Sequence, residues 1–276
     1  MIDQSSLLLW KQIVPWPNEF QVEQDLVISR ALINIFNHPI LKTSLAFRGG
    51  TALQKLFFPK PLRYSEDLDF VQVNPGSIGP LFDALKEVLD PWLGCPKRKI
   101  GAGRATLIYR FNAADPNQTP LRLKVEINTR EHFNCQPLLT IPFSITTPWF
   151  SGKTTLITYQ IEELLATKLR ALYQRKKGRD LFDLARAIEL LVIDVSIIIK
   201  SFQYYLAQMD LTISRAEFEQ NLLLKKELVS FRQDIEPLLP NMLLHSFNKD
   251  FIMVMDQIIN LLPGSPWQGK SSSNKF

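Results

Sequence analysis

The run FRGGTALQKLFFPKPLRYSEDLDF, residues 47–70, constrains the fold most, because a short apolar strand candidate at residues 44–48 ends here at a double glycine. Gly49 and Gly50 let the backbone turn sharply and approach a bound group closely. Thr51 then begins the pattern TALQKLFF, which predicts a short helix. The N-terminus of such a helix offers free N–H groups and a positive dipole end, so it suits a phosphate. A plain strand-to-helix turn is the commoner explanation of Gly-Gly-Thr taken alone.

Two aspartates one residue apart end the same run. Residues 67–73 have the pattern of a strand, so Asp67 and Asp69 share one face while Leu68 and Phe70 share the other. Two carboxylates on one face repel each other, and aspartate is disfavoured in strands. A hard divalent cation that takes oxygen ligands, Mg2+ or Mn2+, removes this repulsion. The pattern therefore favours a metal site over the alternative, an exposed strand edge with two solvated aspartates.

Basic residues and a third carboxylate extend this candidate site. Lys55 and Arg63 can neutralise phosphate charge, and a phosphate cradle, positive charge and carboxylates are together what metal-dependent phosphoryl transfer requires. In LRLKVEIN, residues 121–128, apolar and polar residues alternate, so Glu126 lies on a polar strand face that could adjoin the two aspartates. Glu126 would complete the metal site or act as a base for an attacking hydroxyl. An edge strand with one wet face explains the alternation equally well.

The remaining hydrophobic periodicity predicts a mixed domain followed by helices. Helical spacing occurs over 20–38 and 78–93, strand patterns over 97–128 and 138–150, and helical patterns again from 159 to 262, broken once at 177–178. We therefore expect a core at 1–155, a helical domain at 156–262 that completes the active-site cleft, and a polar, disordered tail at 263–276. The sequence SGKTT is not a P-loop, because Thr147 stands where that motif requires a glycine.

The composition sets bounds without giving a function. Hydrophobic residues make up 46% and charged residues 21% of the 276 residues, as in ordinary soluble domains. Cys95 and Cys135 lack CxxC spacing and indicate free thiols. No apolar run is long enough to span a bilayer, and the first residues do not resemble a signal peptide, so we expect a cytoplasmic protein without a membrane partner. The net charge of +5 permits a nucleic-acid partner, and basic residues cluster at 97–104 and 170–179, although either cluster could be a solvated face.

Two charged residues stand out in the helical part. Lys168 lies in an otherwise apolar turn, so its side chain either extends to the surface or points into a site. Asp180 follows the break at Gly178, near the start of a helix, where a cap or a dipole-favoured acid is the simpler explanation.

Four blocks in this order, FRGGTALQKLF, RYSEDLDF, ELLATKLRALYQR and KGRDLFDLARA, resemble the AbiEii-type (MenT-like) nucleotidyltransferase toxins, a branch of the DNA polymerase β-like superfamily. The resemblance spans about residues 25–190. It implies an α+β fold, in which a polymerase β-like nucleotidyltransferase core with a small mixed sheet flanked by helices precedes a C-terminal helical bundle.

The resemblance also implies roles for individual residues. The phosphates of the nucleotide would be held by the Gly49-Gly50-Thr51 turn and Ser65, with Lys55 and Arg63 assisting. Asp67 and Asp69 would bind Mg2+. Lys168 would contact a phosphate, and Asp180 would be the further catalytic acid.

The activity that the resemblance implies is transfer of NMP from an NTP to an RNA acceptor, notably the tRNA 3′ end, which would block translation. A cognate antitoxin would be the protein partner. Two alternatives remain: a nucleotidyltransferase that modifies a protein or small molecule, and a non-catalytic nucleotide-binding or partner-binding protein on the same fold.

Overall fold

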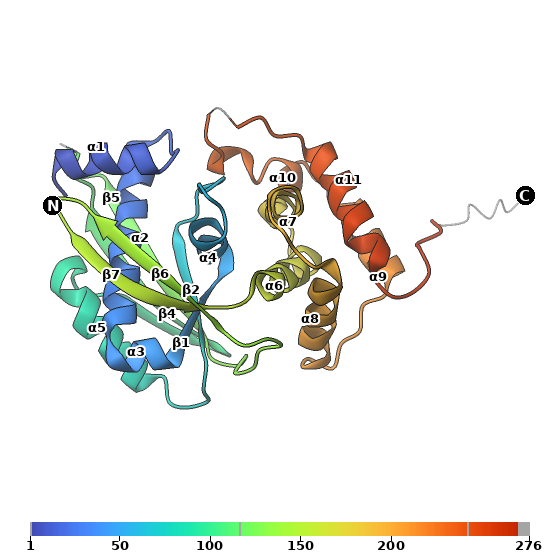
Figure 1. Ribbon diagram of the computed structural model, residues 1–276, viewed down its shortest axis with the longest axis horizontal. Helices are drawn as coiled ribbons and strands as arrows, with labels where there is room; N and C mark the ends of the chain where they lie inside the picture. The colour runs from blue at the N-terminus through green and yellow to red at the C-terminus, as the bar shows by residue number, and fades with distance from the viewer. Residues whose placement is uncertain (1, 116, 242, 270–276) are drawn as a thin grey trace, which may run out of the picture. The chain divides into compact units, whose positions relative to one another are not determined.

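The computed structural model describes residues 2–115, 117–241 and 243–269 of the chain. The chain forms two compact units. Unit 1 comprises residues 1–160 and 238–243, and unit 2 comprises residues 161–237 and 244–276. Figure 1 labels most of the elements, which are numbered in chain order. In the part that the structure describes, no helix is long and apolar enough to cross a membrane.

Unit 1 is built on one mixed sheet. Its helices are α1 (Gln4–Ile13), α2 (Glu19–Asn37), α3 (Pro39–Ser44), α4 (Gly49–Leu56) and α5 (Gly79–Leu93). Its strands are β1 (Leu45–Arg48), β2 (Asp67–Gln72), β3 (Lys97–Gly101), β4 (Arg104–Asn112), β5 (Pro120–Asn128), β6 (Leu139–Thr146) and β7 (Ser151–Thr158). The order across the sheet is β3-β4-β5-β2-β1-β7-β6. Strand β2 runs parallel to β5, and β1 runs parallel to β7.

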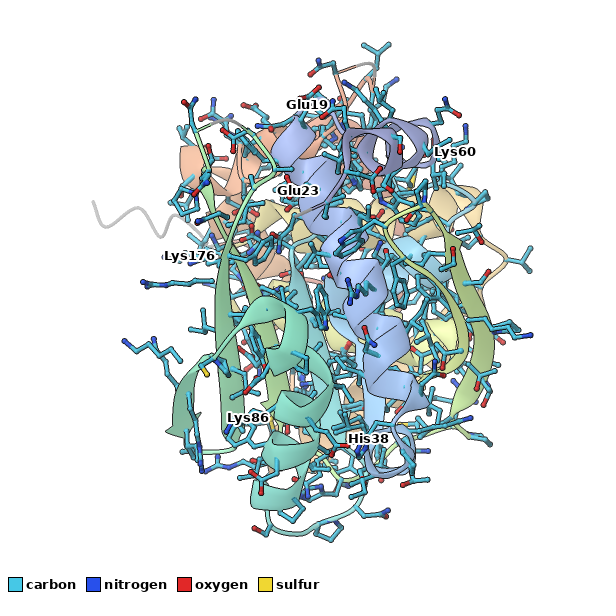
Figure 2. All side chains as sticks on the ribbon, turned by 90° about the vertical axis from the view of Figure 1, so that its left-hand side faces the viewer. Glu19, Glu23, His38, Lys60, Lys86 and Lys176 are labelled. Atoms are coloured by element: carbon cyan, nitrogen blue, oxygen red, sulfur yellow. The ribbon has the colours of Figure 1, made fainter. Side chains whose placement is uncertain are left out.

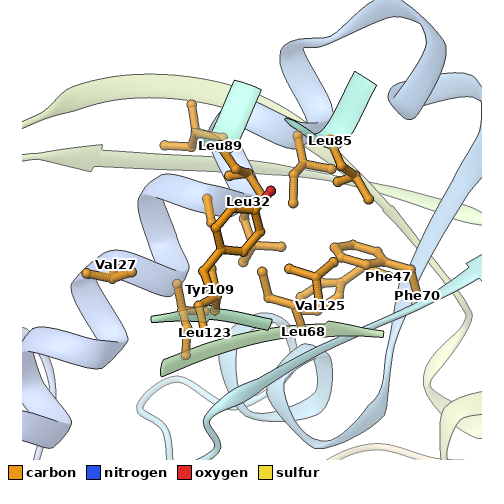
Figure 3. Packing of buried hydrophobic residues seen from close by; sticks show 14 of the residues in the cluster. Val27, Leu32, Phe47, Leu68, Phe70, Leu85, Leu89, Tyr109, Leu123 and Val125 are labelled. Carbon is orange, nitrogen blue, oxygen red and sulfur yellow. The ribbon is translucent and has the colours of Figure 1, made fainter. Parts of the chain in front are cut away.

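One face of this sheet is covered by α2 and α5, which lie side by side across it (Figure 2). Apolar side chains from both helices and from the inward face of the strands form the core (Figure 3). Leu68 and Phe70 are inward residues of β2, and Leu123 and Val125 are inward residues of β5. Since the intervening residues point to the opposite face, burial of this apolar set directs the polar residues of β2 and β5 away from the core.

The expected elements around the glycine turn are confirmed. The helix expected at 20–38 is α2, the strand expected at 44–48 is β1, and the strand that carries the two aspartates is β2. The helix after the turn begins at Gly49, two residues before the expected start at Thr51. Strand β7 was not predicted, because its first residues, SGKTT, lack apolar alternation. It runs to residue 158, beyond the expected end of the core at 155.

Unit 2 is helical. Its elements are α6 (Ile161–Gln174), α7 (Gly178–Leu190), α8 (Val195–Ala207), α9 (Arg215–Lys226), α10 (Val229–Arg232), α11 (Phe247–Gln257) and the short 3-10 turns Glu236–Leu238, which ends in unit 1, and Ile259–Leu261. Lys225 is 4% exposed and donates to the carbonyls of Leu172 and Tyr173. It thereby satisfies two of the carbonyls at the C-terminus of α6 that have no partner within the helix. Burial lowers the pKa of Lys225 to about 8.

The tail expected to be disordered starts at 263, and its first residues contact α9. The backbone N–H of Arg215 donates to the carbonyl of Pro263, and the N–H of Trp267 donates to Glu219. Residues 270–276 lie outside the described residues.

Candidate active site

The glycine turn of α4 lies directly against the second aspartate. Gly49 has a φ of +82°, and a Cβ at this position would lie 2.4 Å from Oδ2 of Asp69. A Cβ at Gly50 would lie 2.4 Å from Nη2 of Arg63 and 3.0 Å from Oγ of Ser65. Only glycine allows such approaches at both positions. The two glycines therefore bring the start of α4 into contact with three of the predicted site residues.

Hydroxyl groups link the same segments. The Thr51 hydroxyl donates to the carbonyl of Asp67, at 2.5 Å, and lies 2.9 Å from the Ser65 hydroxyl. Arg63 is 2% exposed, and its Nη1 donates to the carbonyl of Tyr64. Polar groups that could meet a phosphate are thus gathered at the N-terminus of α4, where the helix dipole favours an anion.

The carboxylates of β2 and β5 are neighbours. Asp69 pairs with Glu126 in the register of these parallel strands, as expected from the polar strand face, and Asp67 pairs with Lys124. Lys124 Nζ lies 3.0 Å from Asp67 Oδ2 and 3.2 Å from Glu126 Oε2. Nε of Arg104 lies 2.9 Å from Glu126 Oε1. Glu126 is therefore already engaged by two cations of the chain.

The charge around Asp69 is not balanced. Burial raises the pKa of Asp69, and the carboxylates of Asp67 and Glu126 raise it further. The cations of Arg48 and Lys124 oppose this rise without reversing it. Arg48, which is paired with Asp69 in the β1–β2 register, forms its ion pair with Glu131. The ionised form of Asp69 thus lacks a sufficient counter-charge.

Glu126 as a third metal ligand stays a prediction. Among the described residues, no group of three or more His, Cys, Asp or Glu side chains is arranged to hold a metal ion. Asp67 and Asp69 remain as two neighbouring protein carboxylates. Mg2+ is commonly held by one or two carboxylates, with substrate phosphates completing its coordination.

Lys55 does not join this group. Its Nζ lies 2.8 Å from Asp25 Oδ1 and 3.0 Å from the Ser29 hydroxyl, both on α2. Its side chain is only 9% exposed. Lys55 therefore ties α4 to α2, and this arrangement does not support the predicted contact with phosphate.

In unit 2, Lys168 and Asp180 form a compact ionic cluster. Lys168 is 6% exposed, so it does not extend to the surface. Its Nζ lies 3.2 Å from Asp180 Oδ1 and 2.9 Å from Asp183 Oδ2. Arg175 binds Asp180 with both Nε and Nη2, at 2.6 and 2.8 Å. The structure thus brings Lys168 and Asp180 together and adds Asp183, for which no role was predicted, and Arg175, which was predicted only as part of the basic cluster at 170–179.

Asp180 is fully buried, and its carboxylate accepts from Lys168 and Arg175, whereas the backbone N–H of Arg179 at the N-terminus of α7 donates to Asp234. Burial alone would raise the pKa of Asp180, but Lys168 and Arg175 outweigh it, so the pKa is lowered. The carboxylate is therefore held ionised by its partners.

Comparison with known proteins decides the family. Residues 30–253 match the family described as "Nucleotidyl transferase AbiEii toxin, Type IV TA system". The chain belongs to the AbiEii nucleotidyltransferase toxin family. It is a nucleotidyltransferase of a toxin–antitoxin system, with an NTP substrate and an antitoxin partner implied by this membership.

One solved structure shows the fold of the AbiEii chain. It is similar to MenT4, nucleotidyltransferase toxin Rv2826c from Mycobacterium tuberculosis H37Rv, with a TM-score of 0.60 and 17% identity over 91% of this chain and 89% of that one. An antigenic nucleotidyltransferase-like protein from Paracoccidioides brasiliensis gives a TM-score of 0.42 and 20% identity, over 68% of this chain and 87% of that one. None of the curated proteins matches the sequence. The expected α+β nucleotidyltransferase fold is confirmed.

Proposed function

We propose that this AbiEii toxin transfers NMP from an NTP to an RNA acceptor, the 3′ end of tRNA, and thereby blocks translation. The observation that carries the proposal is the contact between the glycine turn of α4 and Asp69, because it joins a phosphate-binding helix start to a carboxylate that lacks counter-charge. The reaction takes place in the cytoplasm, where NTPs and tRNA are found.

Asp67 and Asp69 are the residues that would hold a divalent ion, Mg2+ or Mn2+. They fit this role, because a cation would stabilise the ionised form of Asp69, whose pKa is raised by burial and by two neighbouring carboxylates. When bound, the ion would supply charge neutralisation for the transferred phosphoryl group. Glu126 is proposed as a supporting residue that keeps Lys124 beside Asp67.

The phosphates of the NTP would lie against the N-terminus of α4. Gly49 and Gly50 let Asp69, Arg63 and Ser65 lie against this helix start. Ser65 and Arg63 would offer hydroxyl and guanidinium donors to the phosphates, and Thr51, whose hydroxyl donates to the carbonyl of Asp67, would hold the turn in place. Lys168 would contact a nucleotide phosphate, and Asp180 would hold the Lys168 ammonium in place.

The reaction is a substitution at the α-phosphate. A hydroxyl oxygen of the acceptor forms a bond to the α-phosphorus while the bond to the bridging oxygen of the β-phosphate breaks. Pyrophosphate leaves, and the hydroxyl proton is released to solvent. The protein contributes positioning and charge stabilisation rather than a covalent intermediate.

The test is label transfer from α-labelled NTPs to total tRNA in the presence of MgCl2. Wild-type protein should label tRNA, and Asp69→Asn should lower the rate by about 10³-fold, since it removes a carboxylate that would hold the ion acting on the transferred phosphoryl group. Asp83→Asn is a matched control, because Asp83 is an exposed carboxylate on α5 in the same unit.

The same assay separates the alternatives. If label appears on protein or on a small molecule and not on tRNA, that molecule and not RNA is the acceptor. Labelling that is absent with all four NTPs, or that persists undiminished in Asp69→Asn, would contradict the catalytic assignment.

A further inference from the structure

The face of the sheet that carries Asp67 and Asp69 continues across β5, β4 and β3 to the edge of the sheet. Residues that pair in the register of neighbouring strands point to the same face. Asp67 pairs with Lys124, Lys124 pairs with Ile108, and Ile108 pairs with Lys97. Lys97 at the edge therefore shares a face with Asp67.

A second row runs parallel to the first. Asp69 pairs with Glu126, Glu126 with Thr106, and Thr106 with Lys99. Lys99 therefore shares this face as well. Neighbouring strands lie about 4.8 Å apart, so three such steps place the basic edge about 14 Å from the two aspartates.

Arginines flank these rows on the same face. In the β4–β5 register, Arg110 lies opposite Arg122, two positions along these strands from Ile108 and Lys124. Arg104 lies two positions from Thr106 on β4. The side chains of the arginines and of Lys97 and Lys99 are exposed. We call this surface the basic sheet face and define it by five residues: Lys97, Lys99, Arg104, Arg110 and Arg122.

Part of this positive charge is not used within the chain. Arg104 pairs with Glu126, and Arg122 lies 3.5 Å from Glu66. In the described parts of the chain, Lys97, Lys99 and Arg110 form no ion pair. Like charges gathered on one face repel one another, so an anionic partner would stabilise this arrangement.

The other basic segment, residues 170–179, is mostly engaged. Arg170 is 8% exposed and lies over the ring of Tyr205. Arg175 binds Asp180, and Lys177 and Arg179 lie near Asp234. Of the two basic clusters in the sequence, the one at 97–104 is therefore the better candidate for a polyanion.

We propose that the basic sheet face binds the sugar–phosphate backbone of the RNA acceptor, beside the nucleotide that reacts at Asp67 and Asp69. This inference rests on the proposed function. The face offers mainly exposed cations, with Ile108 as a partly buried apolar residue between them, which suits a phosphate backbone better than a protein core contact. Its distance of about 14 Å from the aspartates allows contact with the last few nucleotides of the acceptor.

The experiment compares two triple variants of the full chain that lose the same charge. Lys97→Ala/Lys99→Ala/Arg110→Ala removes the unpaired cations of the basic sheet face. Lys11→Ala/Lys42→Ala/Lys86→Ala removes exposed lysines from α1, α3 and α5. Figure 2 shows Lys86 on α5, which covers the opposite side of the sheet. The dissociation constant for tRNA is measured against salt concentration, and KM for tRNA and for the NTP are measured by label transfer.

We expect the basic-face variant to bind tRNA at least about tenfold more weakly and to show a salt slope smaller by about 2, because three phosphate contacts are lost. KM for tRNA should rise, while KM for the NTP and the NTP-induced rise in Tm stay at wild-type values. The control variant should keep wild-type affinity and slope.

The outcomes separate this inference from the proposed function. If wild type transfers label to tRNA and both triple variants bind it equally well, the basic sheet face is not the RNA site and the proposed function stands. If wild type binds tRNA through this face without transferring label, the function fails and the face stands. If wild type binds no tRNA, or if polyglutamate of equal charge displaces tRNA equally well, the inference is overturned.

Discussion

Two carboxylates of this toxin, Asp69 and Asp180, differ in how their charge is balanced. Asp69 in unit 1 lies beside Asp67 and Glu126, and its pKa is raised. Asp180 in unit 2 is fully buried and bound by Lys168 and Arg175, and its pKa is lowered. Both residues are acids that the family resemblance marks as catalytic.

The difference indicates that Asp69 and Asp180 have different roles. An under-compensated carboxylate costs folding free energy and gains it back when a cation binds, as expected of a ligand site. A carboxylate that already has two cations gains little from a third charge, so Asp180 fits a positioning role, in which it fixes Lys168. The comparison suggests that unit 1 binds the ion and unit 2 presents a pre-arranged ammonium group.

The largest effect on stability is expected for Asp180→Asn. The change leaves Lys168 buried with one carboxylate fewer, and breaking a buried ion pair in this way costs about 3 kcal/mol of unfolding free energy. Urea denaturation followed by circular dichroism measures it. Asp256→Asn on α11 is the exposed control.

The pH dependence of this loss follows from the lowered pKa of Asp180. Its contribution is present above the ordinary value of 3.8 and is lost as pH falls through the lower folded value. The difference between wild type and Asp180→Asn should therefore persist at neutral pH and shrink only below about pH 4. An unchanged urea midpoint in Asp180→Asn would remove the proposed contrast.

Asp69→Asn should change the free energy of unfolding in the opposite direction to Asp180→Asn and by a smaller amount. Because the folded pKa of Asp69 is raised, the folded state loses stability as pH rises from the ordinary value of 3.8 through the folded value. Removing the carboxylate abolishes this loss, so the metal-free variant should be more stable than wild type at neutral pH by about 0.5–2 kcal/mol. The gain should disappear as pH falls toward 4.

Glu126→Gln should have the smallest effect. If Glu126 serves only to hold Lys124 and Arg104, its loss costs less than about 1 kcal/mol, since these pairs are partly exposed. Label transfer should then fall by less than about tenfold, with an unchanged dependence on Mg2+ concentration. A marked rise in the Mg2+ concentration needed for half-maximal rate would instead identify Glu126 as a metal ligand.

Sequence patterns predicted the parts of the site that depend on local rules. Strand alternation placed Asp67 and Asp69 on one face of their strand and Glu126 on the polar face of another. The register shows that Glu126 is the neighbour of Asp69, one of the two arrangements that the alternation left open. The double glycine predicted a sharp turn that approaches a bound group; the structure shows the turn, with the side chains of Asp69 and Arg63 lying against it.

Tertiary partners could not be predicted in the same way. Lys55 was expected at the phosphates, but its partner Asp25 lies thirty positions earlier on another helix. Lys124 was visible as a polar strand residue, yet its position between two carboxylates depends on the β2–β5 register. Strand β7 was not predicted, because its start contains Thr and Gly and has little apolar alternation.

The most direct test of the contrast is the Tm of wild type, Asp69→Asn and Asp180→Asn, with and without saturating MgCl2 at neutral pH. We expect metal-free Asp69→Asn to melt above wild type, and Mg2+ to raise the Tm of wild type but not of Asp69→Asn. Asp180→Asn should melt lower and still respond to Mg2+. An Asp69→Asn variant that melts below wild type and gains as much from Mg2+ as wild type does would contradict the assignment of Asp69 to the metal site.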